Sequence, residues 1–210
     1  MFALTSADLA GRILGCADGP ASFNAEATRR GTQVTSCDPL YRYGGNEIRQ
    51  RIAATYPTIM EQTLQNRQEF VWHEFSSPAE LGQARLNAME VFLADYDAGR
   101  VQGRYIAGEL PTLPFDNHVF DLGLCSHFLF LYSDQLTLEF HVNAILELSR
   151  VAHEVRIFPV HSLGGVRSHH LEPVCSRLQE SGLAIELKRV PYEFVRGVNQ
   201  MMCLRPIEGQ

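Results

Sequence analysis

The chain has 210 residues, of which 45% are hydrophobic, and this length suits a single domain with a sizeable core. Its 24 Asp and Glu residues outnumber its 18 Lys and Arg residues, which gives a formal net charge of -6. Nucleic acids are held mainly by clustered Lys and Arg, so this balance gives no support for a nucleic-acid partner. No apolar run approaches the roughly 20 residues that span a bilayer, so we expect no membrane partner.

The N-terminal residues lack the basic start and the long apolar stretch of a signal peptide. The five cysteines are widely spread and form no CxxC pair. We therefore expect free, reduced thiols in a cytoplasmic protein without structural zinc. His161, His169 and His170 lie near one another, but no Asp or Glu completes a familiar ligand spacing, so we predict no metal site.

Segments typical of strands and of helices alternate along the chain, which indicates a parallel α/β sheet. In chain order, we predict strands at about residues 11–16, 33–37, 104–107, 120–124, 154–160, 184–190 and 200–204. We predict helices from near Pro20 to Gly31, at 47–67, from Ser77-Pro78 toward Asp97 with Gly99 as the stop, after Ser133-Asp134, and at 171–181.

The stretch at about 42–103 is too long for a simple crossover between strands. Its second helix has apolar residues at helical spacing, which predicts one buried face: Leu81, Ala84, Ala88, Val91 and Phe92. We interpret the stretch as a helical insert over the carboxyl edge of the sheet. Six aromatic residues could line a pocket there or pack in the core: Tyr41, Tyr43, Tyr56, Phe70, Trp72 and Phe75. Tyr192 and Phe194 could form a further wall.

The last two predicted strands are separated by residues 191–199, which show no helical pattern. They therefore fit an antiparallel hairpin that closes the sheet. Most nucleotide-binding α/β folds end in another helix instead.

A glycine-containing turn follows the first predicted strand, at residues 15–20. Glycine lets the backbone approach a ligand closely, and the following helix N-terminus offers free N–H groups to an anion. Asp38 ends the second strand, nineteen residues after Gly19, where an acid can accept both hydroxyls of a ribose. The alternatives are an ordinary tight turn and a turn-forming Asp before Pro39.

These two features suit a nicotinamide dinucleotide or S-adenosylmethionine. The dinucleotide fingerprint requires G-x-G-x-x-G/A, but Ala17 and Pro20 occupy its second and third positions here. The observed spacing is G-x-A-x-G, which is closer to the G-x-G-x-G turn of methyltransferases.

The third feature is the run GELPTLPFDNHVFDL at residues 108–122. It resembles the acidic residue, LPF and FD signature between the third and fourth strands of class I S-adenosylmethionine-dependent methyltransferases. With the first turn and Asp38, the resemblance covers the N-terminal two-thirds of the chain in order. More narrowly, the chain resembles a bacterial group of methyltransferase-domain proteins of unassigned function.

The resemblance implies a Rossmann-like α/β fold, with a seven-stranded, mostly parallel sheet, an antiparallel last strand and helices on both faces. It also implies one domain over residues 1–210, with S-adenosylmethionine as cofactor. In this reading the backbone of Gly15, Ala17 and Gly19 passes beneath the methionine part of the cofactor. Asp38 takes the ribose hydroxyls.

The same resemblance places Pro39 and Leu40 beside the adenine. Glu109 stands where an acid receives the adenine amino group, and the Leu110 N–H meets a ring nitrogen. Cys125, Ser126 and His127 face the methionine end and the substrate.

The chain departs from the family pattern at three places. Ile13 stands where the first strand usually carries an acid, Ala17 replaces the middle glycine, and Val151-Ala152-His153 replaces Pro-Gly-Gly. Asp18 is the candidate to supply the missing carboxylate.

His127 is the candidate catalytic base, because it lies at a strand's carboxyl end and its unperturbed pKa is near 6.5. The alternative is a histidine that packs in an apolar strand end. The sequence thus favours a methyltransferase acting on a small-molecule substrate. A non-catalytic cofactor-binding or assembly protein, an NAD-dependent oxidoreductase, and a homodimer stay open.

Overall fold

A computed structural model describes residues 1–207, and within them seven strands form one sheet in the order β3-β2-β1-β4-β5-β7-β6. The strands are β1 (Arg12–Cys16), β2 (Gln33–Cys37), β3 (Tyr105–Ile106), β4 (Phe120–Ser126), β5 (Ala152–Phe158), β6 (Leu183–Arg189) and β7 (Gln200–Pro206). The α-helices are α1 (Ser6–Ala10), α2 (Phe23–Arg29), α3 (Gly45–Gln65), α4 (Pro78–Val101), α5 (Leu138–Val151) and α6 (Leu171–Glu180). Three short 3-10 helices are η1 (Pro39–Arg42), η2 (Arg67–Glu69) and η3 (Phe130–Tyr132).

The first five strands run parallel, and β7 lies antiparallel between β5 and β6. This confirms the predicted mostly parallel sheet and the closing hairpin. The order reverses at β1, because β2 follows it on one side and β4 lies on the other. Such a switch point, at the carboxyl ends of the strands, is where open α/β sheets bind ligands.

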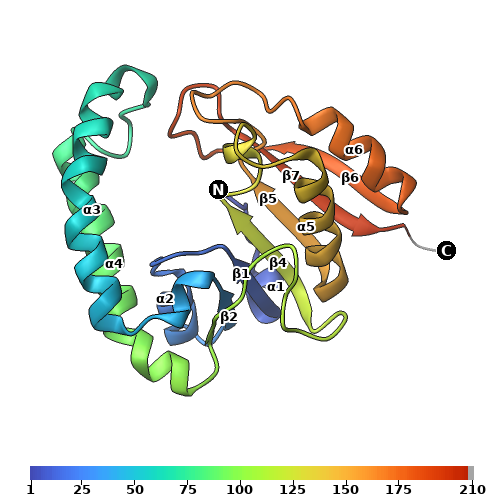
Figure 1. Ribbon diagram of the computed structural model, residues 1–210, viewed down its shortest axis with the longest axis horizontal. Coiled ribbons are helices and arrows are strands. Elements are labelled where there is room, and N and C mark those ends of the chain that lie inside the picture. The colour runs from blue at the N-terminus through green and yellow to red at the C-terminus, as the bar shows by residue number, and fades with distance from the viewer. Residues whose placement is uncertain (208–210) are drawn as a thin grey trace.

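Helices cover both faces of the sheet, as predicted (Figure 1). Side chains alternate along a strand, so Ile13 faces the α2 side, where it packs with Ala27 and Val34. Its neighbour Leu14 faces the opposite side and joins the larger core that includes Ile145 of α5. Both residues are fully buried.

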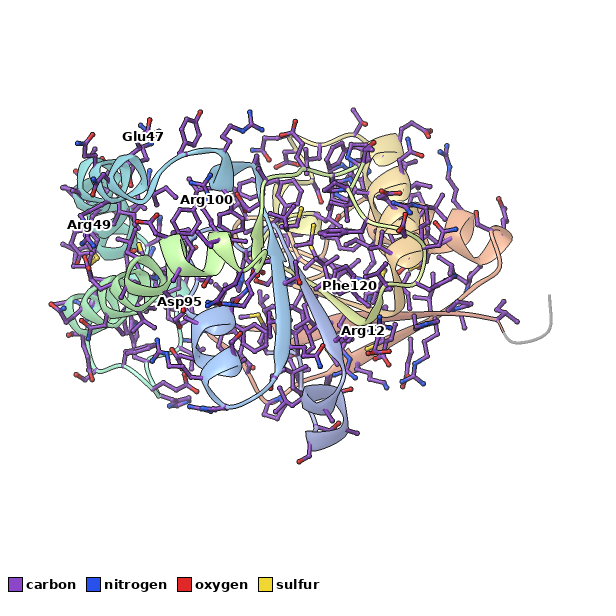
Figure 2. The ribbon with its side chains drawn as sticks, turned by 90° about the horizontal axis from the view of Figure 1, so that it is seen from below. Arg12, Glu47, Arg49, Asp95, Arg100 and Phe120 are labelled. Atoms are coloured by element: carbon purple, nitrogen blue, oxygen red, sulfur yellow. The ribbon has the colours of Figure 1, made fainter. Side chains whose placement is uncertain are left out.

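Helices α3 and α4 form a long antiparallel pair beside the sheet (Figure 1). Arg49 of α3 binds Glu90 of α4 at 2.7 Å, and Asp95 of α4 binds Arg104 at 2.7 Å (Figure 2 labels Arg49 and Asp95). The tip of the pair is the segment at 66–77 that joins the two helices, and it contacts the loop before β7 at 190–199. There the Val71 N–H donates to the Phe194 carbonyl at 2.8 Å. Among residues 1–207, no helix combines the length and apolarity that a membrane crossing requires.

Three helix boundaries differ from the sequence predictions. Helix α2 begins at Phe23 and not near Pro20, because the turn before it is fixed by bonds from Gly19 to Asp38 and Tyr41. Helix α4 continues through Gly99, whose missing side chain leaves room for the Tyr105 ring, and it ends before Gly103 at φ +74°.

Helix α5 begins after Thr137, later than predicted. The Thr137 hydroxyl accepts from the Phe140 N–H at 3.2 Å and caps this end.

Candidate functional site

A cavity of about 770 Å³ lies at the switch point, where the carboxyl ends of β1, β2 and β4 meet. We call it the switch-point crevice. Most of the predicted site residues line it: Ala17, Asp18, Gly19, Asp38, Pro39, Glu109, Leu110, Ser126 and His127. Gly15 and Leu40 do not line it. Gly15 lies beneath Asp18, and the Leu40 side chain packs against the cluster of Tyr41, Phe92 and Tyr96.

The turn between β1 and α2 has the conformation that a glycine-rich turn requires. Ala17 and Gly19 both have φ +58°, in the left-handed region that L side chains avoid. Ala17 therefore keeps the backbone path of the glycine that it replaces, at a cost in strain. Its N–H donates to the Cys37 carbonyl at 2.9 Å, which ties the turn to the end of β2.

Asp38 connects the turn to the end of β2. Its Oδ2 accepts from the Gly19 N–H at 2.9 Å, and its Oδ1 accepts from the Leu40 N–H at 2.7 Å. A carboxylate oxygen has about two lone-pair sites, so each oxygen retains one for a ligand hydroxyl. The turn is held from a second side by the Tyr41 hydroxyl, which donates to the Gly19 carbonyl at 2.8 Å.

Asp18 is the acid beneath this turn. The Ser36 hydroxyl donates to Asp18 Oδ2 at 2.6 Å. Burial raises the pKa of Asp18 to about 6; the bond from Ser36 opposes the rise and the charge of Asp38 adds to it. Ile13, which replaces the usual acid of the first strand, is buried on the α2 side and does not reach the crevice. Asp18 lines the crevice, whereas Ile13 does not.

Glu109 and Leu110 lie at the far end of the crevice. The Glu109 side chain is 67% exposed and lies 3.6 Å from the Arg42 guanidinium. An ion pair that is so exposed contributes little to stability. Leu110 is buried, and within residues 1–207 its N–H meets no protein acceptor. A carboxylate and a free backbone donor are thus close together there.

His127 follows β4 and adopts φ +53°, an uncommon conformation that is found where function positions a residue. Its N–H donates to the Phe158 carbonyl at 2.7 Å, and its ring lies edge-on to the Phe158 ring with centroids 5.7 Å apart. Burial, then the charges of Arg85 and of the N-terminal amino group, lower the pKa of His127. The ring is therefore neutral at pH 7 and able to accept a proton.

A second cavity, of about 620 Å³, shares His127 and Tyr132 with the crevice. We call it the aromatic cavity, after the side chains of Phe70, Phe158, Tyr192 and Phe194 in its wall. Of the two alternatives for the aromatic residues, a pocket wall or core packing, the first holds for Phe70, Tyr192 and Phe194. Tyr41 packs in the core and Tyr43 is exposed, so neither contributes. Arg85, also in this wall, was missed from the sequence.

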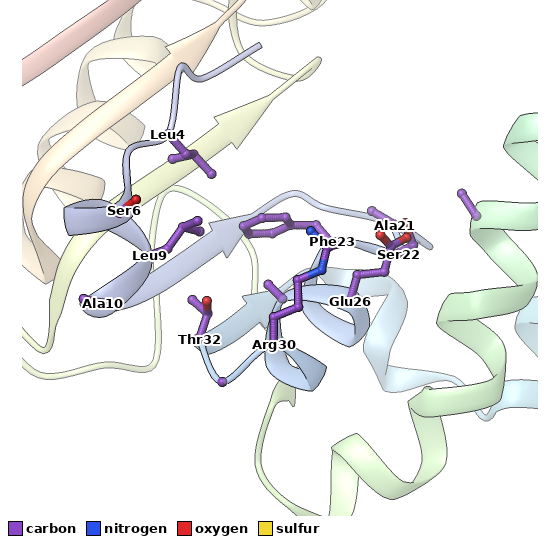
Figure 3. A pocket seen from close by; sticks show the side chains of 13 residues that line it. Leu4, Ser6, Leu9, Ala10, Ala21, Ser22, Phe23, Glu26, Arg30 and Thr32 are labelled. Atoms are coloured by element: carbon purple, nitrogen blue, oxygen red, sulfur yellow. The ribbon is translucent and has the colours of Figure 1, made fainter.

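A further hollow of about 710 Å³ lies between α1 and α2 (Figure 3) and shares only Ala21 with the switch-point crevice. Leu9 and Phe23 supply much of its apolar wall, with Glu26 and Arg30 beside them. None of the predicted site residues lies in it. Within residues 1–207, no group of three or more His, Cys, Asp and Glu side chains is placed to hold a metal ion.

No family model matches the chain. Its structure is similar to that of a TehB-like SAM-dependent methyltransferase from Corynebacterium glutamicum, with a TM-score of 0.50 and 14% identity over 94% of this chain and 80% of that one. A SAM-dependent methyltransferase from Methanosarcina mazei is 11% identical over 95% of this chain and 94% of that one, with a TM-score of 0.48. The protein has the fold of the class I S-adenosylmethionine-dependent methyltransferases.

The uncharacterized protein MJ0045 of Methanocaldococcus jannaschii is 34% identical over 207 residues, which cover 98% of this chain and 90% of that protein. The chain belongs to the same family as MJ0045. This relative is archaeal, so the match does not confirm the bacterial grouping expected from the sequence.

Proposed function

We propose that the protein transfers a methyl group from S-adenosylmethionine to a small-molecule acceptor. The observation that carries the proposal is the switch-point crevice, which presents Asp38 and the β1–α2 turn to a cavity of about 770 Å³. This volume lies within the range of small-molecule sites, roughly 300–1,000 Å³. The crevice also meets a second cavity at His127, which gives an acceptor a place beside the cofactor.

The residues of the crevice fit the cofactor in kind. Asp38 has an acceptor site left on each oxygen for the ribose hydroxyls. Glu109 and the Leu110 N–H offer an acceptor and a donor to the adenine edge. Asp18 offers a carboxylate to the methionine ammonium. This acid lies in the turn after the first strand, whereas the family usually carries it on the strand itself.

When bound, S-adenosylmethionine supplies a sulfonium methyl group, whose carbon–sulfur bond breaks with its electron pair going to sulfur as an acceptor lone pair bonds to the carbon. The protein has to orient the acceptor and exclude water. His127 lines both cavities and so lies where the cofactor and the acceptor meet. In its neutral form it takes the proton that a hydroxyl or ammonium acceptor loses. Its lowered pKa keeps it unprotonated at neutral pH.

Calorimetry with S-adenosylmethionine and S-adenosylhomocysteine tests the proposal. We expect both to bind the native protein, and Asp38→Ala to weaken binding at least tenfold. Asp116→Asn, at an exposed turn, is the matched control and keeps native affinity. Folded native protein that gives no heat with either ligand would contradict the proposal.

A non-catalytic, cofactor-binding regulatory or assembly protein of the same fold is the second candidate. The buried Ile13 supports it, because the acid of the first strand is missing. Cofactor binding without methyl transfer in an acceptor screen would favour it, as would a stable complex with another chain. Protection from thermal unfolding by NAD but not by S-adenosylmethionine would instead favour an oxidoreductase.

We also expect the protein in the cytoplasm, since its cysteines are free thiols. A homodimer stays an open alternative to the monomer, and light scattering distinguishes the two.

A further inference from the structure

Two pairs of aromatic rings lie in the wall of the aromatic cavity. Phe70 and Phe194 stack with ring centroids 4.7 Å apart, and Phe158 and Tyr192 meet edge-on at 5.6 Å. The first pair brings together the tip of the α3–α4 pair and the loop before β7. A cavity of about 620 Å³ lined by these rings suits a ligand with a flat, apolar body.

Arg85 of α4 brings a positive charge into this wall. It follows Leu81 by four residues and precedes Ala88 by three, so helical spacing places it on the inward face. Its Cζ lies 5.9 Å from the centroid of the Phe194 ring, a cation–π distance. Burial lowers the pKa of Arg85, but a guanidinium keeps its proton in proteins.

Within residues 1–207, the Arg85 guanidinium has no hydrogen bond and no acidic partner within 4.0 Å. The other partly buried arginines have one: Arg104 binds Asp95 at 2.7 Å, Arg150 binds Glu147 at 2.8 Å, and Arg156 binds Asp8 at 2.9 Å. The titratable groups whose charges couple to Arg85 are Tyr56, Tyr192 and His127. Glu69 also lines the cavity, but its side chain is exposed and makes no ion pair with Arg85.

A partly buried charge without a partner costs free energy, which an anionic ligand would recover. The planar guanidinium fork matches a carboxylate in two parallel hydrogen bonds. Arg85 is the one Lys or Arg residue among those that line the cavity, and a single guanidinium balances one negative charge, which favours a carboxylate over a doubly charged phosphate monoester.

We propose that the aromatic cavity binds a small carboxylic acid with a flat, unsaturated body, and that Arg85 pairs with its carboxylate. As an assignment of the methyl acceptor, this rests on the proposed function. The carboxylate compensates the Arg85 charge, and the body lies against the Phe194 and Phe158 walls. Once the acid is bound, its carboxylate offsets the charge of Arg85 that lowers the pKa of His127, so His127 becomes a stronger base.

The test compares acids with their uncharged amides by calorimetry, on protein saturated with S-adenosylhomocysteine. The pairs are 4-hydroxybenzoate, 4-hydroxyphenylacetate and indole-3-acetate, each with its amide. We expect at least one acid to bind ten times more tightly than its amide. Arg85→Gln should bring the two affinities within twofold, whereas Arg85→Lys retains part of the preference. Arg51→Gln, at an exposed position of α3, is the matched control.

Equal affinity of every acid and amide for the native protein, or no binding by any acid, overturns the proposal. So does an Arg85→Gln variant that keeps the preference. Binding of S-adenosylhomocysteine, which should change less than twofold in all three variants, shows that they are folded. If that ligand fails to bind native protein while an acid still binds through Arg85, the methyltransferase proposal fails and the carboxylate site stands. If the cofactor binds but no acid binds more tightly than its amide, the carboxylate proposal fails and the methyltransferase proposal stands.

Discussion

The carboxylate of Asp18 occupies the space in which a side chain on residue 15 would begin. A Cβ built on Gly15 would lie 2.6 Å from Asp18 Cγ and would overlap Oδ2. Glycine is therefore required at residue 15 by the acid three residues later. In this chain the first glycine of the turn makes room for a side chain of the protein itself.

Gly15→Ala is expected to push Asp18 away from Ser36 and to lower the free energy of unfolding by about 1–3 kcal/mol, as overpacking does. Urea unfolding measures the loss. In an Asp18→Ala background the same substitution should cost much less, because the clash is gone. Equal costs in the two backgrounds would show that Asp18 is not the obstacle. Gly19→Ala is the comparison at an open position of the turn, where only the strain of φ +58° opposes the new methyl group.

Asp18→Asn is expected to stabilise the cofactor-free protein at pH 7.5 and to lose this advantage as the pH falls. The folded-state pKa of about 6 lies above the ordinary aspartate pKa of 3.8, so the native state binds more protons than the unfolded state between these values. The free energy of unfolding therefore falls as the pH rises through this window, by up to about 3 kcal/mol. Asparagine resembles the protonated form and avoids this loss.

Urea unfolding at pH 4 and pH 7.5 measures the effect, with Asp116→Asn as the exposed control. An advantage of Asp18→Asn that is the same at both pH values would contradict the prediction. Cofactor binding should respond in the opposite direction, because an ammonium group beside Asp18 favours the ionised carboxylate. We expect affinity for S-adenosylmethionine to rise with pH around 6 in the native protein.

His127 is expected to titrate below 6.5 in the free protein. Nitrogen-detected NMR of the imidazole rings, with His127→Gln to assign the signal, measures this pKa. Arg85→Gln removes a nearby positive charge and should therefore raise it. If the pKa is unchanged in Arg85→Gln, the two side chains are not electrostatically coupled.

Ala17→Gly should leave affinity for S-adenosylmethionine within threefold of native, because Ala17 already follows the glycine path at φ +58°. Relief of left-handed strain and the greater freedom of glycine in the unfolded state oppose each other, so stability should change by less than about 1 kcal/mol. Calorimetry and urea unfolding give the two values. A tenfold gain in affinity would mean that the alanine impairs binding.

The sequence predicted the seven strands because each is a short apolar run bounded by turn residues, and such signals are local. The predicted start of α2 near Pro20 was wrong for a tertiary reason: Asp38 and Tyr41 hold Gly19 in a turn that helical propensity cannot reveal, and the helix begins at Phe23. The extension of α4 through Gly99 depends likewise on Tyr105, a residue outside the helix.

The crevice residues could be gathered from motif spacing, because the carboxyl ends of parallel strands meet at one edge. The contacts of Asp18 with Gly15 and Ser36 could not, since they depend on how the turn folds back over the sheet. Arg85 left one signal: it is a charge on the apolar face of a helix, between Leu81 and Ala88. Such a residue is noticed only when the face is expected to line a cavity and not a core.

The two cavities share His127 and Tyr132 but otherwise draw on different parts of the chain. The switch-point crevice takes its wall from residues at 16–21, 37–39, 108–110 and 126–140, whereas the tip of the α3–α4 pair and the loop before β7 contribute to the aromatic cavity alone. Substitutions in those two segments can therefore reshape the choice of acceptor while nucleoside contacts stay intact. If relatives of this chain act on different substrates, we expect their sequences to differ most at the tip and in that loop, while the residues at the carboxyl edge of the sheet stay the same.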